Sequence, residues 1–379
     1  MQTLNRLLIL LLCASLFACA SDDEEVVVAS PLVDFTPTKN IKKNWSYSVK
    51  GVGDLHNNIV PAVQYGKVFL PSGDGRIVAL NEKTGKKIWE ADLDANISGA
   101  IGVGNGVVAV GTLDAEVIVL DEKTGKRLWK ARVSSEVTAP PTVGDNTVIV
   151  NAIDGKLFCL ELKSGKRRWF YDRSVPVLTL RGTGSSQIAR GAAVAGFANG
   201  KVAAFVIESG GLIWEKRVAS PSGRSELDRM IDIDSTPVIF GDTVYAASYN
   251  GNIVALSLRS GDVLWQRELS TYQNISVTST SVYASNYVSH VKAMSRSNGA
   301  AMWTQNALAN RNITGPTVFK GTVVVGDFEG YLHFLDGSNG RFVARIQQDD
   351  AGFLVAPVVA GETLYALSRD GTLNAYSIQ

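Results

Sequence analysis

The chain has 379 residues, with 37 basic and 36 acidic side chains, a formal net charge of +1 and 36 glycines. Because 45% of the residues are hydrophobic and 19% are charged, the composition is typical of a turn-rich globular protein and excludes a disordered chain. The balanced charge gives no electrostatic basis for binding nucleic acid, and three cysteines and three histidines are too few for a disulfide framework or a zinc site.

Residues 1–18 are predicted to be an export signal. Arg6 precedes an apolar run that starts at Leu7 and is too short to cross a bilayer as a helix. The end of this segment resembles the lipobox of bacterial lipoproteins, in which small and apolar residues precede a cysteine that is acylated, with palmitate among its lipids, and becomes the mature N-terminus. The resemblance implies lipidation of Cys19. The alternative is an ordinary cleavage site at which Cys19 has no role.

The residues after Cys19 predict where the anchored protein resides. In enterobacterial lipoproteins an Asp directly after the cysteine retains the protein at the inner membrane, and here Ala20 stands in that place. Its absence implies an outer-membrane protein that is lipid-anchored and faces the periplasm. Residues 19–40 include four consecutive acids from Asp22 to Glu25 and are predicted to form a flexible tether.

Residues 41–379 contain a repeat of about 40 residues. Six of the seven tryptophans end a phrase in which Thr, Ser or Asn is followed by Gly and, four residues later, by Trp; a seventh copy has Ala344 in the Trp position. Upstream of each phrase lies a hairpin turn, most often Asp-Gly or Asn-Gly, and there are eight such turns, from Asp74-Gly75 to Asp370-Gly371. The tryptophans are Trp45, Trp89, Trp129, Trp169, Trp214, Trp265 and Trp303.

This repeat predicts an all-β fold, an eight-bladed β-propeller of four-stranded antiparallel blades. The chain ends at Gln379, before the last unit acquires its Trp-bearing strand, so the strand around Trp45 is expected to close the last blade. We interpret the recurring Trp as packing between neighbouring blades rather than as a cofactor cage.

Two segments lengthen the repeat. About 5 extra residues follow Trp169 and about 11 follow Trp214, each between the last strand of one unit and the first strand of the next. Loops in equivalent positions emerge on the same face of a propeller, and consecutive blades place them side by side. Such enlarged neighbouring loops are where we expect a partner to bind.

The phrase Gly-x-(Ile/Val)-x-Ala-Leu-x-x-x-(Thr/Ser)-Gly-x-x-x-Trp resembles the PQQ-like repeat of quinoprotein dehydrogenases and covers nearly all of residues 41–379. Together with the lipobox, the length and the two long segments, it makes the whole chain resemble the BamB (YfgL) family, the propeller lipoproteins of the outer-membrane β-barrel assembly (BAM) complex. The resemblance implies a non-enzymatic scaffold. Such a scaffold binds the central barrel subunit through its POTRA domains and assists the folding and insertion of outer-membrane proteins.

The same resemblance implies five partner-binding residues. Leu178, Leu180 and Arg181 lie in the first long segment, where two apolar side chains beside a guanidinium form a plausible anchor. Asp232 and Asp234 lie in the acidic second segment. A further interpretation, compatible with the first, is that the two loops brace each other through Arg181 and either acid.

Two other classes of function stay open. A periplasmic quinone-dependent dehydrogenase is expected to carry vicinal cysteines and calcium ligands, whereas Cys159 stands alone in an apolar run. A stand-alone binder would pair its strand edges with unfolded outer-membrane proteins. Since His56, His290 and His333 lie in three different units and in no catalytic motif, we expect no catalytic residue, metal site or cofactor.

Overall fold

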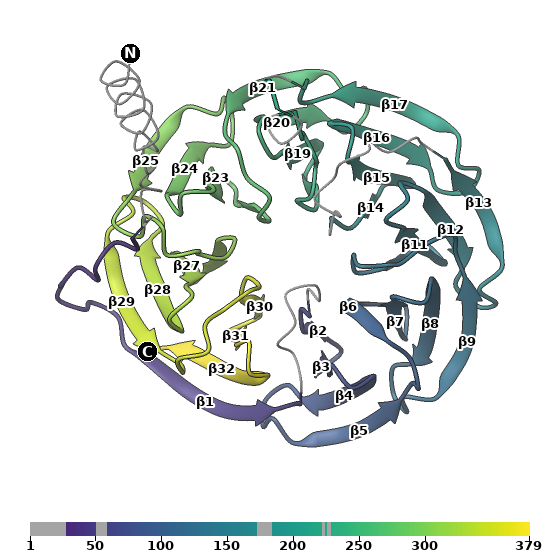
Figure 1. Cartoon of the computed structure of the whole chain (residues 1–379), viewed down its shortest axis with the longest axis horizontal. Coiled ribbons are helices and arrows are strands. Elements are labelled where there is room, and N and C mark those ends of the chain that lie inside the picture. Colours follow the sequence, from purple (N-terminus) through teal and green to yellow (C-terminus); the bar gives the residue numbers. More distant parts are fainter. Residues whose placement is uncertain (1–27, 51–58, 173–183, 222–223, 226–228) are drawn as a thin grey trace, which may run out of the picture.

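The computed structural model describes residues 28–50, 59–172, 184–221, 224–225 and 229–379. Within these ranges the chain forms eight separate four-stranded antiparallel sheets, arranged as the blades of a closed ring (Figure 1). This arrangement confirms the predicted all-β fold and the eight-bladed propeller. In the described part of the chain, no helix has the length and apolar character required to cross a membrane.

The first four blades follow the chain from the inside of the ring to the outside. Blade 1 is β2 (Ala62–Gln64), β3 (Lys67–Pro71), β4 (Arg76–Asn81) and β5 (Lys87–Asp92), and blade 2 is β6 (Ile97–Gly104), β7 (Val107–Thr112), β8 (Glu116–Asp121) and β9 (Arg127–Arg132). Blade 3 is β10 (Thr142–Gly144), β11 (Thr147–Asn151), β12 (Leu157–Glu161) and β13 (Arg167–Tyr171), and blade 4 is β14 (Gln187–Ala189), β15 (Ala192–Phe197), β16 (Lys201–Val206) and β17 (Leu212–Arg217).

The next three blades repeat this order, and the last one combines both ends of the chain. Blade 5 is β18 (Val238–Phe240), β19 (Thr243–Ala247), β20 (Asn252–Ser257) and β21 (Val263–Glu268), and blade 6 is β22 (Ser276–Val277), β23 (Ser281–Ser285), β24 (Val291–Ser295) and β25 (Ala301–Gln305). Blade 7 is β26 (Thr317–Phe319), β27 (Thr322–Gly326), β28 (Tyr331–Asp336) and β29 (Phe342–Gln347), and blade 8 is β30 (Val358–Ala360), β31 (Thr363–Leu367), β32 (Thr372–Ile378) and β1 (Ile41–Ser48).

Burial explains the sequence of each strand. The second and third strands of a blade, such as β7 and β8, are buried along almost their whole length because neighbouring blades cover both faces, so they are continuous runs of Val, Ile, Leu and Ala. The outer strand is different: in β9 most side chains are exposed. The hydrophobic core is therefore a series of layers between blades, such as the one that joins blades 1 and 2 around Phe69, Trp89 and Ile118.

The ring closes as predicted. Strand β1 pairs antiparallel with β32, with Trp45 opposite Ala375, and so supplies the outer strand of blade 8. Beyond the ladder, the amide of Gln379 donates a hydrogen bond to the carbonyl of Asn40 at 3.0 Å. Pairing the two ends of the chain removes an open sheet edge and makes the ring one cooperative unit.

Each tryptophan joins its blade to the next one. The indole Nε1 donates a hydrogen bond of 2.7–3.0 Å to a backbone carbonyl in the turn between the third and fourth strands of the following blade. The ring lies against the glycine of that turn, where an added Cβ would meet ring atoms at 2.5–2.7 Å. These glycines have φ between +67° and +74°, so both the backbone conformation and the adjacent indole disfavour a side chain there. The pairs are Trp45 and Gly85, Trp89 and Gly125, Trp129 and Gly165, Trp169 and Gly210, Trp214 and Gly261, Trp265 and Gly299, and Trp303 and Gly340.

The eighth interface has no such pair, and the ring closure explains why. Blade 8 takes its third and fourth strands from opposite ends of the chain, so it has no turn between them that an indole from blade 7 would contact. Ala344 occupies the Trp position of β29 and packs in a layer with Phe334 and Tyr376 instead. The departure from the repeat at Ala344 thus follows from the way the ring closes.

Residues 28–40, which we name the N-terminal strap, differ from the flexible tether that the sequence predicts for residues 19–40. The strap runs along the outside of blade 7 before it enters β1 (Figure 1). Phe35 stacks on Phe342 at 5.4 Å, and the Arg345 guanidinium lies over the ring of Phe35. These contacts hold the strap against β29, because the Phe35 ring stacks on one of its side chains and lies under the guanidinium of another.

Candidate partner-binding face

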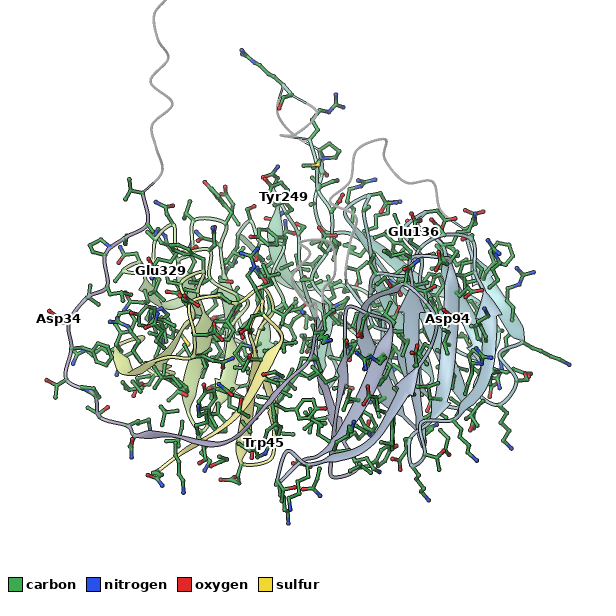
Figure 2. All side chains as sticks on the ribbon, turned by 60° about the horizontal axis from the view of Figure 1, so that its bottom comes forward. Asp34, Trp45, Asp94, Glu136, Tyr249 and Glu329 are labelled. Atoms are coloured by element: carbon green, nitrogen blue, oxygen red, sulfur yellow. The ribbon has the colours of Figure 1, made fainter. Side chains whose placement is uncertain are left out.

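The described ends of both long segments lie on one face of the ring, which we name the loop face. It is formed by the connections between blades and by the hairpins between second and third strands, which in a meander lie on the same side. Figure 2 shows Tyr249 and Glu329 from two of these hairpins, and Glu136 and Asp94 from two of these connections, toward the same face of the ring. The first long segment joins β13 to β14 and the second joins β17 to β18, so the described ends of both belong to this face.

The structure describes part of the predicted site. Leu178, Leu180 and Arg181 lie outside the described residues. Asp232 and Asp234 are described, and their side chains are buried, with exposed fractions of 0% and 6%. Sequence reasoning placed both acids in an acidic loop but gave no sign that they are buried.

Alternation of apolar and acidic residues explains how the second segment is held. Ile231 and Ile233 are buried, and Ile233 packs into the layer between blades 4 and 5. The amide of Tyr249 donates to the carbonyl of Asp232 at 2.9 Å, and the Ser235 hydroxyl donates to the carbonyl of Ala247 at 2.9 Å. The acids therefore lie on backbone that the core fixes in place.

The described ends of the two long segments touch. Gly184 packs so closely against the backbone of Asp234 that a Cβ would lie 2.8 Å from its carbonyl oxygen. The amide of Ser185 donates to the Thr236 hydroxyl at 3.0 Å, and the Asn151 side chain donates to the Gly184 carbonyl at 3.2 Å. The expected side-by-side placement of the two segments is thus seen at their bases.

The acidic pair has unusual electrostatics. Burial raises the pKa of Asp234 to about 7, and the neighbouring Asp232 carboxylate adds to the shift because it disfavours a second negative charge. Asp234 also lines a cavity of about 50 Å³ between blades 3 and 4, together with Lys156 and Phe197. Near neutral pH Asp234 is therefore partly protonated, so the pair carries less than its full negative charge.

Two observations concern metal binding and nucleophiles among the described residues. Among the described residues, no group of three or more His, Cys, Asp or Glu side chains is placed to hold a metal ion. Cys159 is buried, and the loss of water raises the pKa of its thiol to about 11, so the thiolate that a nucleophile requires is suppressed.

One polar cluster was missed by sequence reasoning. In blade 7 and the connection before it, Arg311, Asp327 and His333 are buried, and the Asp327 carboxylate is hydrogen-bonded to both other side chains. In the sequence, His333 stands out only as a residue outside any catalytic motif. Because Arg311 and Asp327 belong to different elements, no spacing signal connects them.

Together, the repeat and the ring define a β-propeller of the PQQ-like class. A family model described as "Outer membrane protein assembly factor BamB" matches residues 73–305 and 288–379. A protein of that name from Pseudomonas aeruginosa is 50% identical over 372 residues, which cover 98% of each chain, and one from Escherichia coli is 38% identical over 94% of each chain. The chain therefore belongs to the BamB family, as its sequence features predicted.

Solved structures agree with this assignment. The crystal structure of BamB from Moraxella catarrhalis superposes with a TM-score of 0.81 at 26% identity, over 89% of this chain and 100% of that one. Quinohemoprotein alcohol dehydrogenase from Comamonas testosteroni gives a TM-score of 0.71 at 14% identity, over 91% of this chain and 78% of that one, which shows the shared fold alone. Since the relatives similar over the whole length are named assembly factors, the protein is classed as non-enzymatic and the dehydrogenase alternative is disfavoured.

Proposed function

We propose that this protein is a non-enzymatic scaffold of the BAM complex that assists the folding and insertion of outer-membrane proteins. The observation that carries the proposal is the match to proteins named outer membrane protein assembly factor BamB over almost the whole length of both chains. A rigid ring with one elaborated face is suited to holding a partner in a fixed orientation.

The proposed partner is the central barrel subunit, which binds through its POTRA domains to the loop face over blades 3–5. The proposed contact residues are Leu178, Leu180, Arg181, Asp232 and Asp234. One observation supports this choice: the bases of both segments are in contact on the same face of the ring. A preorganised face loses little conformational entropy on binding.

The proposed location is the outer membrane, with the propeller in the periplasm. Acyl chains on Cys19 would hold it there, and more than one chain gives stable anchoring. The name of the relatives supports association with the outer membrane. The anchor itself rests on the lipobox in the sequence.

Affinity capture of the tagged full-length chain from detergent-solubilised envelopes tests this proposal. The wild type is expected to retain one barrel protein with POTRA domains at a fixed stoichiometry. Arg181→Glu and Asp232→Asn are expected to weaken capture, whereas Arg168→Glu, which alters an exposed cation outside the loop face, is not. Circular dichroism verifies that each variant is folded. The Asn substitution is chosen because Asp232 is buried, so a charge reversal there would also test folding.

Each outcome has a definite meaning. Equal capture by the wild type and both loop variants contradicts the assignment of the contact residues. Capture of many unrelated chains at low yield, without a barrel protein, favours the stand-alone binder of unfolded outer-membrane proteins. If the wild type retains neither a barrel protein nor unfolded outer-membrane proteins, the scaffold proposal is wrong.

A further inference from the structure

The N-terminal strap follows a fixed path to the loop face. The amide of Ser30 donates to the carbonyl of Ala309 at 2.9 Å, the Arg311 guanidinium donates to the carbonyl of Ser30 at 2.9 Å, and the Asn310 side chain donates to the carbonyl of Val28 at 3.3 Å. These residues belong to the connection between blades 6 and 7, which lies on the loop face. The described chain therefore begins at a defined point beside blades 6 and 7.

A buried polar cluster makes this attachment rigid. Arg311 donates from Nε to the Asp327 carboxylate at 2.8 Å, and its side chain is 3% exposed. Arg345 donates from Nε to Nδ1 of His333 at 3.1 Å, so the other ring nitrogen carries the proton and donates to Asp327 at 2.9 Å. Burial lowers the pKa of His333, which keeps this ring neutral. The arginines are thus fixed from behind by groups that water does not reach.

Arg345 holds the middle of the strap in the same way. Its Nη1 donates to the carbonyl of Val33 at 3.0 Å, and its guanidinium lies over the rings of Phe35 and Phe342 at 5.1 and 5.2 Å. The strap is therefore attached at both Ser30 and Val33. While these bonds remain, the chain meets the propeller at one fixed place beside Val28, which we call the exit point.

Exposed apolar side chains surround the exit point. Val28 is 72% exposed, Tyr287 at the hairpin of blade 6 is 64% exposed, and Phe328 at the hairpin of blade 7 is 37% exposed. Backbone hydrogen bonds place them around one connection, since the amide of Asn310 donates to the carbonyl of Val288, and the amide of Phe328 donates to the carbonyl of Arg311. We name Val28, Tyr287 and Phe328 the exit patch.

The charges beside the exit patch are compensated. The Arg311 guanidinium also lies over the Phe328 ring at 5.4 Å and pairs with the Glu329 carboxylate at the rim. Aromatic and aliphatic side chains such as these are suited to the polar-apolar boundary of a lipid bilayer, where aromatic rings are favoured.

We propose that the exit patch rests on the surface of the bilayer that receives the lipid anchor, so that the strap sets the orientation of the propeller on the membrane. This inference depends on the proposed lipidation of Cys19. Nine residues lead from Cys19 to Val28, and even a fully extended chain of that length spans only about 30 Å. The exit patch lies where that short connection ends, whereas blades 2 and 3 lie on the far side of the ring (Figure 1).

Depth-dependent quenching on vesicles tests the proposal. The full-length lipidated chain carrying Tyr287→Cys or Tyr65→Cys is labelled with an environment-sensitive fluorophore and reconstituted in vesicles of phosphatidylethanolamine and phosphatidylglycerol that contain headgroup-nitroxide lipid. Tyr65 is a matched control because it is a 46% exposed tyrosine in the hairpin between β2 and β3, on the face opposite to the loop face. Cys159 is buried and does not compete for the label.

The label at position 287 is expected to lose most of its fluorescence, and the label at position 65 is expected to lose none beyond that of free dye. Adding Arg345→Gln, which frees the strap, should reduce the quenching at 287 while the protein stays on the vesicles. Equal quenching at both positions, or none at 287 on membrane-bound protein, overturns the proposal and leaves the anchor intact. A chain that does not partition to vesicles refutes the anchor instead. Protection of position 287 only when the barrel subunit is added assigns the patch to a protein partner and overturns the proposal.

Discussion

The contact between Trp89 and Gly125 provides a quantitative test of how the blades are joined. Gly125 has φ +70° and an added Cβ would lie 2.6 Å from the Trp89 ring, whereas Gly106, in the same blade, has φ +78° with nothing within 4 Å. Alanine at either position incurs the left-handed backbone penalty of about 1 kcal/mol. At Gly125 the indole must also move, and it then loses a hydrogen bond worth about 1 kcal/mol to the Glu122 carbonyl, together with part of its packing.

We therefore expect Gly125→Ala to cost about 3 kcal/mol of unfolding free energy and Gly106→Ala about 1 kcal/mol. Urea unfolding followed by circular dichroism measures both. On a Trp89→Ala background the additional cost of Gly125→Ala should fall to that of Gly106→Ala, because the obstructing ring is gone. Equal costs for the two glycines in the wild-type background, or an undiminished cost without the indole, would refute the assignment of the tryptophans to blade packing.

Three further predictions concern titration, reactivity and the strap. Because folding raises the pKa of Asp234 from 3.8 to about 7, the contribution of this residue to stability should fall as pH rises from 4 to 7. Asp234→Asn should therefore be more stable than the wild type at pH 8, by up to roughly 4 kcal/mol, but not at pH 4. Urea midpoints that differ by the same amount at both pH values would contradict this. Cys159 should react with a thiol reagent at pH 8 only after unfolding, and rapid labelling of the native protein would argue against its burial. Arg345→Gln should accelerate tryptic cleavage after Lys39, while Arg341→Gln, an exposed cation of the same blade, should leave the rate unchanged.

The sequence predicts those parts of the fold that local chemistry determines. A hairpin turn such as Asp74-Gly75 recurs in each unit and the Gly-to-Trp spacing recurs in six of them, so the blade number and the role of Trp45 in ring closure follow from counting. The strap was not predictable in this way, because its composition is that of a tether. The residues that bind it, including Arg345, come next to it only when the ring closes. The burial of Asp234 was hidden for the same reason, since an acidic loop looks exposed until the adjacent blades cover it.

The interface between blades 7 and 8 connects these observations. It is the interface without a Trp and Gly pair, and there the amides of Thr38 and Lys39 donate to the carbonyl of Val343 at 2.9 and 3.1 Å. These bonds attach the strap to blade 7 immediately before the chain enters β1 of blade 8. A pull from a membrane anchor would therefore reach the strap's contacts with blade 7 before it reached the pairing of β1 with β32. The bonds from the strap to blade 7 thus lie between the anchor proposed at Cys19 and the strand pairing that closes the ring.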